Sequence, residues 1–342
     1  MLKNTTALFH LVCIACLTAL SPLVMAQEKK SNASDTALIE CTNRGALDEK
    51  YCDNNRDLVA DASVVRVNPR KLVLGISATE DAATARRTYF PLIDHLNKCT
   101  KREVELYPVF REGAVLEAQR NGIIQIGQYA TGSMMLAVNF AGAVPFAAKG
   151  KSSVGRFDSY TLKLLVRADS TYKQPQDLVG KKIAHTSQSS NSGNLAPRAL
   201  FPELGLRPEI DYKVEYSGGH EKSMVGLRLG LYDAAAIASD VLNRLVAKGE
   251  LRNEDFRVLF ESDPFPPDSF SVSNNLDVKL VGQIQKCFSE FTFPPAIAKT
   301  LEDNNKFYPI NYRKDWQVIR LIAKAAGRSP DRKAYEAALA KK

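Results

Sequence analysis

The chain has 342 residues and a formal net charge of +8, from 46 lysines and arginines against 38 aspartates and glutamates. Its length exceeds what one hydrophobic core usually supports, so we expect two lobes. The positive charges are spread along the sequence and form no arginine-rich run, which excludes most nucleic-acid binders. They are compatible with an anionic ligand or with a solvated basic surface.

The segment Met1–Ala26 is typical of a signal peptide. A single early cation, Lys3, precedes an apolar run, and Val24-Met25-Ala26 fits the small-residue rule for cleavage. An N-terminal membrane anchor is the alternative, although polar residues and a proline interrupt the run. No later segment approaches the roughly 20 apolar residues of a membrane span. We therefore expect a soluble, monomeric, periplasmic protein that begins at Gln27.

Four cysteines follow this segment, and an oxidising compartment favours their pairing. Cys41 with Cys52 would close a short polar loop. Cys99 with Cys287 is the remaining combination, and it requires the late helices to return to the first lobe. Two free buried thiols are the alternative for the second pair.

Residues 27–69 are polar and are expected to form an exposed extension stapled by the first cysteine pair. The acidic run Asp53 to Asp57 lacks the glycine and terminal glutamate of a calcium loop. No metal and no cofactor are predicted.

From Lys71 onward, short apolar strands alternate with helical stretches. Strands are expected at 72–76, 104–110, 123–126 and 144–147, with helices near 87–97 and 114–120. A second series has strands at 161–166, 182–185, 213–216, 234–238 and 256–260, with helices from 194, 221 and 241, and the tail from Val278 is expected to be mostly helical. The alternation predicts an α/β fold with two lobes, each a mostly parallel sheet flanked by helices.

The two series are not separated by a glycine or serine linker. The lobes are therefore expected to be joined by strand crossovers, as in a hinge that closes a cleft. We predict lobe 1 from residues 70–160 plus 266–342 and lobe 2 from residues 161–265.

The polar segment 186–194 follows a strand and opens a helix, where unpaired amide groups bind anions. Ser189, Ser190, Asn191 and Ser192 add side-chain donors, and Gly193 lets the chain pass close to a ligand. The alternative is a polar turn whose serine caps the helix. The P-loop pattern is missing, so a nucleotide phosphate loop is not supported.

The segment Ser217-Gly218-Gly219-His220-Glu221 repeats this arrangement, and His220 could donate to an oxyanion. Met224 replaces the second histidine of a zincin, which excludes that zinc site. Asp240 follows a later strand, and Asp268 follows a proline-rich turn. Either carboxylate could bind a ligand's cation or proton, or could act as a cap or turn former.

With these segments, the chain resembles the phosphate, phosphite and phosphonate solute-binding proteins of ABC transporters, the PhnD-like family of type II periplasmic binding proteins. The marks are the Ser190 to Gly193 loop, the His220 segment, the Ala235-Ala236 strand leading to Asp240, and the turn before Asp268. The resemblance spans residues 71–321. It implies a Venus flytrap that closes two lobes around a small tetrahedral oxyanion.

The resemblance also implies roles for individual residues. Ser190, Asn191, Ser192 and His220 would hold the anion's oxygens, Thr79 and Tyr129 would reach it from lobe 1, and Tyr160 would lie near the hinge. Asn191 departs from the hydroxyl residue common in the family.

Asp240 and Asp268 match an acidic pair that grips the ammonium of aminoalkyl phosphonates in the family, although Asp240 is one methylene shorter than the usual glutamate. The same carboxylates could instead accept hydrogen bonds from a protonated phosphite, phosphate or arsenate.

The function that this resemblance implies is capture of the anion for an ABC permease, without catalysis. A related branch senses arsenite through a cleft cysteine, so a sensor partnered with a membrane histidine kinase is the alternative. A hydrolase using Ser190 and His220 is disfavoured, because the G-x-S-x-G elbow is missing.

Overall fold

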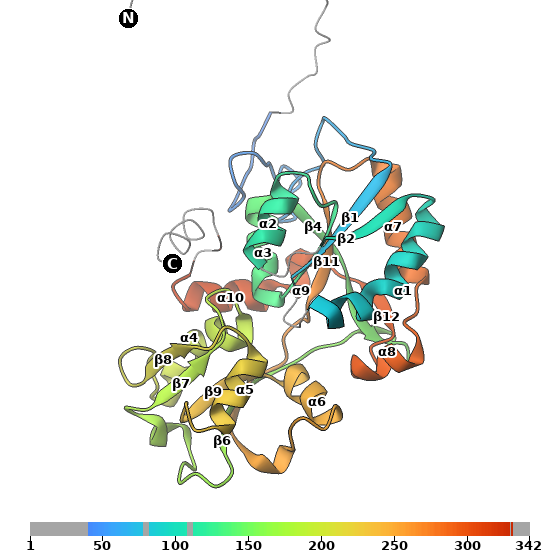
Figure 1. The fold of residues 1–342 in the computed structure, drawn as a ribbon. Coiled ribbons are helices and arrows are strands. Elements are labelled where there is room, and N and C mark those ends of the chain that lie inside the picture. The colour runs from blue at the N-terminus through green and yellow to red at the C-terminus, as the bar shows by residue number, and fades with distance from the viewer. Residues whose placement is uncertain (1–39, 78–81, 108–111, 329, 331–342) are drawn as a thin grey trace, which may run out of the picture. The chain divides into compact units, whose positions relative to one another are not determined.

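The strands of the chain assemble into two separate sheets (Figure 1). The structure is a computed structural model that describes residues 40–77, 82–107, 112–328 and 330. The predicted signal peptide and Thr79 lie outside the described residues. No helix among these ranges is long and apolar enough to cross a membrane.

The first sheet runs in the order β12-β4-β11-β3-β1-β2, with β5 paired to β4. Its strands are β1 (Lys71–Ile76), β2 (Glu103–Tyr107), β3 (Ile126–Tyr129), β4 (Ala143–Lys151), β5 (Arg156–Phe157), β11 (Ser269–Ser273) and β12 (Lys306–Pro309). β1 is parallel to β2 and β3, whereas β11 is antiparallel to β3 and β4. The tail from Val278 is mostly helical, as expected, with β12 as an additional short strand.

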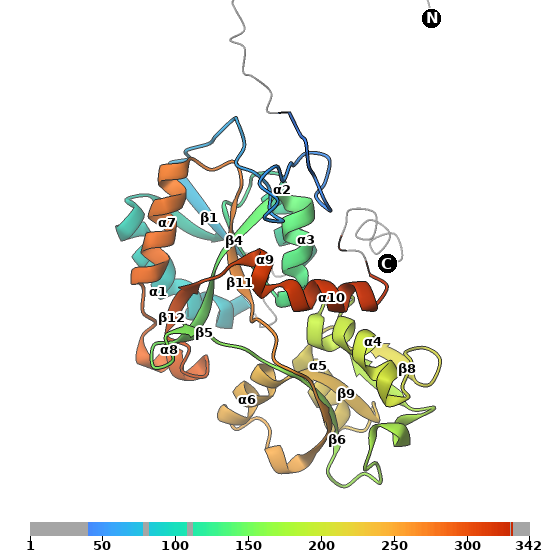
Figure 2. The same cartoon turned by 180° about the vertical axis from the view of Figure 1, so that it is seen from behind.

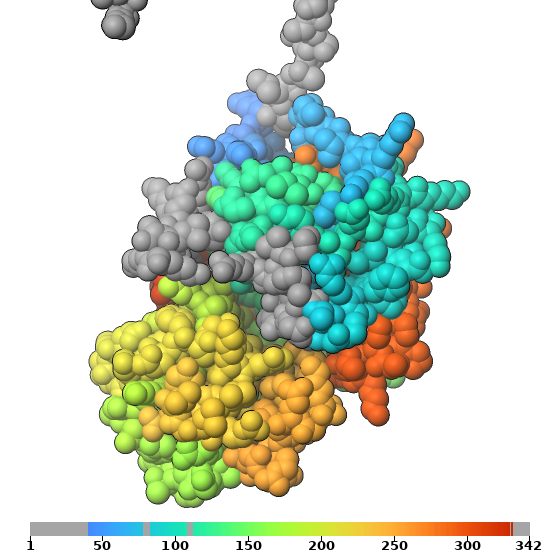
Figure 3. All heavy atoms as spheres, in the orientation of Figure 1, coloured from blue at the N-terminus to red at the C-terminus, as the bar shows by residue number. Residues whose placement is uncertain are grey.

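The second sheet runs in the order β10-β6-β9-β7-β8. Its strands are β6 (Leu162–Arg167), β7 (Lys182–His185), β8 (Lys213–Tyr216), β9 (Ala234–Ala238) and β10 (Phe256–Glu261). β7 is parallel to β8 and β9, and β6 is antiparallel to β9 and β10. Its residues form a continuous light-green to orange body in Figure 3. We call the first sheet with its helices lobe 1 and the second lobe 2.

Helices flank both sheets. In lobe 1, α1 (Ala82–Thr100) and α7 (Val278–Glu290) pack on one face, and α2 (Glu112–Arg120) and α3 (Thr131–Ala141) pack on the other (Figures 1 and 2). Lobe 2 carries the π-helical turn η2 (Asn191–Leu195) with α4 (Ala196–Leu200), α5 (His220–Arg228) and α6 (Ser239–Ala247). The remaining helices are η1 (Pro175–Leu178), η3 (Phe201–Leu204), η4 (Asn253–Asp255), α8 (Pro295–Thr300), α9 (Tyr312–Asp315) and α10 (Gln317–Ala325).

The helix α3 is absent from the sequence-based expectations. All but one of its residues are buried, so it has no polar face and shows no amphipathic period. It packs against α2 and against η2 of the other lobe, and Trp316 donates from its indole N–H to the Thr131 carbonyl at 2.9 Å. Its start is therefore fixed between the two lobes.

The chain passes between the sheets twice, from β5 to β6 and from β10 to β11. The two connections are tied by a bridge in which the Tyr160 N–H donates to the Phe265 carbonyl at 3.1 Å and the Phe265 N–H donates back at 2.7 Å. Two paired crossing strands are a common form of hinge.

Most residues of the extension after residue 40 are exposed or half-buried, and a few pack into the protein. Leu47, Tyr51 and Ala60 join the core that contains α3. Arg120 of α2 forms a buried ion pair with Asp48 at 3.1 Å. The extension therefore belongs structurally to lobe 1.

Both disulfide pairings expected from the sequence are confirmed. Cys41 bonds Cys52 within the extension, and Cys99 at the end of α1 bonds Cys287 of α7. The second bond forms because α7 returns to pack against α1.

Removing the Cys99–Cys287 bond by the double substitution Cys99→Ser and Cys287→Ser should lower the free energy of unfolding by about 4 kcal/mol, since the bond closes a long loop. Urea denaturation with and without reductant measures this. The Cys41→Ser and Cys52→Ser double variant, with a loop of separation 11, should lose less. Equal losses would contradict the account.

Candidate functional site

A cavity of about 1010 Å³ lies between the two sheets. In lobe 1 its walls come from β4, α3 and the segment before β11. In lobe 2 they come from the segments around η2, α5 and α6, and Tyr160 of the crossing strand completes them. Eight of the predicted site residues line it, namely Tyr160, Ser189, Ser190, Asn191, Ser192, His220, Asp240 and Asp268. The sequence-distant motifs thus meet in one place.

Among the described residues, three α-helices of nine or more residues start at this cavity without a side-chain cap. The N-cap residues are Ala130 for α3, Gly219 for α5 and Ala238 for α6, and none of them makes a side-chain cap hydrogen bond. All three residues line the cavity. The first amide groups of a helix have no acceptor within the helix, and the helix dipole makes this end positive.

Of the described α-helices that start away from the cavity, α7 and α9 have a side-chain cap, whereas α8 and α10 have none. Asp277 caps α7 and Asn311 caps α9, each by accepting from backbone amides. Neither residue lines the cavity. The uncapped starts of α3 and α5 therefore place backbone N–H groups where an anion could use them, whereas at the start of α6 the Ser239 N–H already donates to the Thr161 carbonyl at 2.9 Å.

In the loop before η2, two of the serine side chains have partners within the protein. Ser190 Oγ accepts from the Gly193 N–H at 3.1 Å, so this serine is the helix cap. Ser189 Oγ donates instead to Glu112 Oε2 of lobe 1 at 2.9 Å. Gly193 is required for a different reason than expected, because an added Cβ would lie 2.0 Å from Thr186 Oγ1.

Asn191 and Ser192 are both 2% exposed. Asn191 Nδ2 donates to the Tyr160 hydroxyl at 3.1 Å. Burial raises the pKa of Tyr160 to about 12, so its hydroxyl keeps its proton and can donate to a ligand.

His220 is a neutral donor at the start of α5. Its Nδ1 accepts from the Ala238 N–H at 3.3 Å, which places the proton on Nε2, 3.5 Å from Ser192 Oγ. Burial, aided by the nearby Arg244, lowers the His220 pKa to about 4. The long contact to Ser192 leaves the Nε2–H able to turn toward a ligand oxygen.

Both predicted carboxylates lie beside cations of the protein. Asp240 Oδ2 accepts from Arg244 at 3.0 Å. Asp268 Oδ2 accepts from Lys149 Nζ at 2.7 Å and from the Gln128 amide. Burial raises the pKa of Asp268, but the contacts with Lys149 lower it by more, so the pKa lies below its ordinary value.

Tyr129 does not line this cavity. It is fully buried, and its hydroxyl donates to Gln119 Oε1 at 2.6 Å. The strand β3 lies three residues later in the sequence than expected, so Tyr129 belongs to the strand. Its side chain points to the opposite side from the residues before and after it. Gln128 and Ala130, on either side of it, line the cavity instead.

Sequence reasoning missed several cavity residues, chief among them Thr131, Lys149 and Arg244. The signal for Lys149 was present, because a lysine within an otherwise buried strand needs a partner. Thr131 lies on the helix that the sequence did not reveal, and its hydroxyl donates to the Pro266 carbonyl at 2.8 Å.

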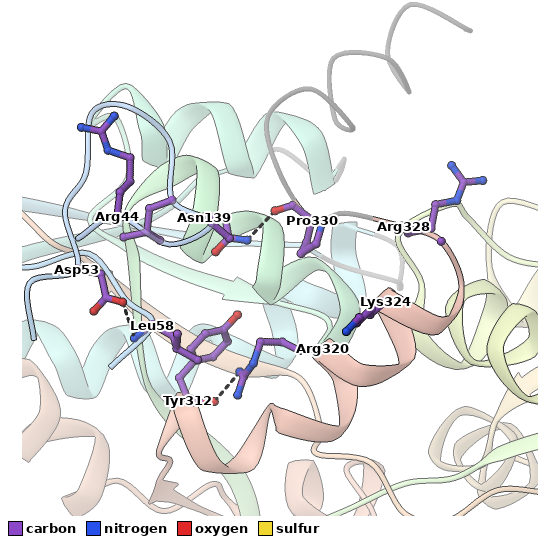
Figure 4. Close-up of a pocket in the computed structure, with 12 residues that line it drawn as sticks. Arg44, Asp53, Leu58, Asn139, Tyr312, Arg320, Lys324, Arg328 and Pro330 are labelled. Carbon is purple, nitrogen blue, oxygen red and sulfur yellow. Dashed lines mark hydrogen bonds between the residues drawn. The ribbon is translucent and has the colours of Figure 1, made fainter. Parts of the chain in front are cut away.

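A smaller cavity of about 450 Å³ lies between the extension and α10 (Figure 4). Arg44, Arg320 and Lys324 line it, and Arg320 donates to the Tyr312 carbonyl. No predicted site residue lines it, and its one carboxylate, Asp53, accepts from the Asp57 and Leu58 amides. The larger cavity is the candidate site.

The buried histidines predict a pH dependence of stability. His185 and His220 have pKa values lowered to about 4, chiefly by burial, whereas unfolding restores the ordinary 6.5. Their contribution is complete above pH 6.5 and is lost as the pH falls from 6.5 toward 4, by up to about 3 kcal/mol each. Urea denaturation across this range should show a shallower loss in His220→Gln than in the wild type. Identical slopes would contradict the neutral buried state of His220.

Residues 74–309 match the family described as ABC transporter, phosphonate, periplasmic substrate-binding protein. The phosphate-import protein PhnD of Mycolicibacterium smegmatis is 25% identical over 234 residues, which cover 65% of this chain and 72% of that protein.

Two solved structures share the fold. A binding protein component of an ABC phosphonate transporter from Pseudomonas aeruginosa has a TM-score of 0.66 at 19% identity, over 76% of this chain and 87% of that one. PhnD1 from Prochlorococcus marinus, in complex with methylphosphonate, has a TM-score of 0.65 at 14% identity, over 76% of this chain and 100% of that one. The fold is thus that of the type II periplasmic binding proteins. The chain belongs to the family of periplasmic substrate-binding proteins of phosphonate ABC transporters and is a transport protein, not an enzyme.

Proposed function

We propose that this chain captures a small tetrahedral oxyanion of the phosphonate, phosphite or phosphate type and presents it to an ABC permease. The observation that carries the proposal is the meeting of three uncapped helix starts at one cavity, with Ala130, Gly219 and Ala238 at their N-caps. Backbone amides at helix starts are suited to phosphate-like anions.

Side chains add donors to these amides. The Nε2–H of His220, the hydroxyl of Ser192 and the hydroxyl of Tyr160 all belong to cavity-lining residues. Hydrogen bonds to a charged group contribute about 1.5–3 kcal/mol each. Four or five of them would support roughly micromolar or tighter binding after desolvation. In this proposal, Gln128 and Thr131 take the lobe 1 role that the family resemblance implied for Tyr129.

Closure of the lobes would complete the site. Ser189 already bonds Glu112, and Asn243 Nδ2 of α6 donates to Glu302 Oε2 at 2.9 Å. Tyr160 lies in the crossing strand and also contacts Asn191, so it connects the hinge to the anion loop. A ligand held by both lobes stabilises the closed arrangement by its difference in affinity for the two states.

The sensor alternative receives no support from the cysteines. Within the described ranges, Cys41, Cys52, Cys99 and Cys287 are all disulfide-bonded. A thiolate is needed to bind arsenite through sulfur. The hydrolase alternative is also unsupported, because the hydroxyl near His220 belongs to Ser192, while Ser190 is the helix cap.

Titration calorimetry with phosphate, phosphite, methylphosphonate, aminoethylphosphonate, arsenate and arsenite tests the proposal. At least one phosphorus oxyanion should bind the wild type, and His220→Ala should weaken that binding by tenfold or more, because it removes a buried donor. The matched control is His95→Ala, since His95 lies on α1 and bonds the Cys287 carbonyl. If no phosphorus oxyanion gave a binding signal, the proposal would be wrong.

Gly132→Ala tests the closure step. An added Cβ would lie 2.1 Å from the Ser189 carbonyl oxygen and 3.0 Å from the Asn191 nitrogen, both on the opposite lobe. The variant should fold but bind the anion at least tenfold more weakly, and X-ray scattering should show a larger ligand-bound radius of gyration. Gly282→Ala on α7, where a Cβ meets nothing within 4 Å, should behave as the wild type. Full affinity in Gly132→Ala would contradict closure by these two segments.

A further inference from the structure

The charges around the cavity indicate which oxyanion it takes. We propose that the ligand is a tetrahedral oxyanion that keeps one O–H group, donates it to Asp240, and carries no ammonium group. This inference rests on the proposed function and narrows its substrate class.

One carboxylate oxygen of Asp240 has no hydrogen-bond partner among the described residues. Asp240 lines the cavity, and this oxygen, Oδ1, is buried. A carboxylate oxygen can only accept, so an anion brought near it is repelled unless the ligand donates a proton. The complementary ligand must therefore carry a donor of its own.

Asn191 also lines the cavity and has a similar unpaired oxygen. It is 2% exposed, and its Oδ1 is also buried without a partner. Because an amide can turn either its oxygen or its nitrogen toward the cavity, Asn191 can follow the ligand, whereas Asp240 cannot. The requirement for a donor therefore comes from Asp240.

Whether that donor can be an ammonium group depends on the charges beside the two carboxylates. Arg244 bonds the other oxygen of Asp240, and Lys149 bonds Asp268 at 2.7 Å. Lys149 also donates to the Tyr89 hydroxyl at 3.1 Å, and its side chain is 12% exposed. The positions beside both carboxylates thus hold cations supplied by the protein.

A ligand ammonium group would enter this space against like charges. The interaction of two such charges is strong where water is excluded, and it disfavours the second cation. An O–H group adds no charge and makes a short, strong bond to a carboxylate. Hydrogen phosphate, hydrogen arsenate and the singly ionised phosphonates fit this description, whereas sulfate carries no O–H group.

Calorimetry on the wild type gives the primary test. Phosphate or methylphosphonate should bind roughly tenfold to hundredfold more tightly than both sulfate and aminoethylphosphonate. Sulfate or aminoethylphosphonate binding as tightly as phosphate would overturn this inference and leave oxyanion capture standing. Failure of every phosphorus oxyanion would instead overturn the proposed function.

Two variants sharpen the result. Asp240→Asn supplies an N–H in place of the acceptor, so it should weaken phosphate binding and improve sulfate binding, each by roughly tenfold. The matched control is Asp263→Asn, because Asp263 is exposed and does not line the cavity. Lys149→Met should raise the affinity for aminoethylphosphonate relative to phosphate. An unchanged phosphate-to-sulfate ratio in a folded Asp240→Asn variant would also overturn the inference.

Discussion

The site depends on helix starts that no side chain caps. The N-cap residues of α3, α5 and α6 are alanine or glycine, so no side chain caps these helices, although capping is the common way to stabilise a helix start. An alanine in place of a capping residue costs about 1 kcal/mol, and a glycine costs a few tenths of that. Three such omissions around one cavity make sense if a bound anion supplies the missing acceptors. The neutral His220 and the hydroxyls of Ser192 and Tyr160 extend the same set of donors without adding net charge.

The positions of these amides depend on both lobes at once. α3 belongs to lobe 1, whereas α5 and α6 belong to lobe 2. Gly132 at the start of α3 lies against the Ser189 to Asn191 backbone, closer than any side chain would allow. The crossing strands, bridged at Tyr160 and Phe265, permit the lobes to separate without breaking either sheet. Binding and closure are therefore parts of one process in this account.

Much of the fold could be predicted, because strands and amphipathic helices leave periodic patterns. The strands of both series lie near their expected places, and the two cysteine pairs form as expected. The helix α3 was not predicted, because burial on all sides removes the polar face by which a helix is recognised in a sequence. Of the site, the loop at 189–192 and His220 were visible as motifs after strands. Lys149 left the signal of a cation in a buried strand, but its partner Asp268 is distant in sequence, and Arg244 pairs with Asp240 at a helical i,i+4 spacing that is common on exposed helices.

The central claim is that helix-start amides from both lobes hold the anion. A crystal structure of the protein with bound phosphate or methylphosphonate tests it most directly. The account predicts ligand oxygens within hydrogen-bond distance of backbone N–H groups at the starts of α3 and α5, and of His220 Nε2. An anion held only by lysine and arginine side chains, with the helix-start amides bonded to water, would contradict it.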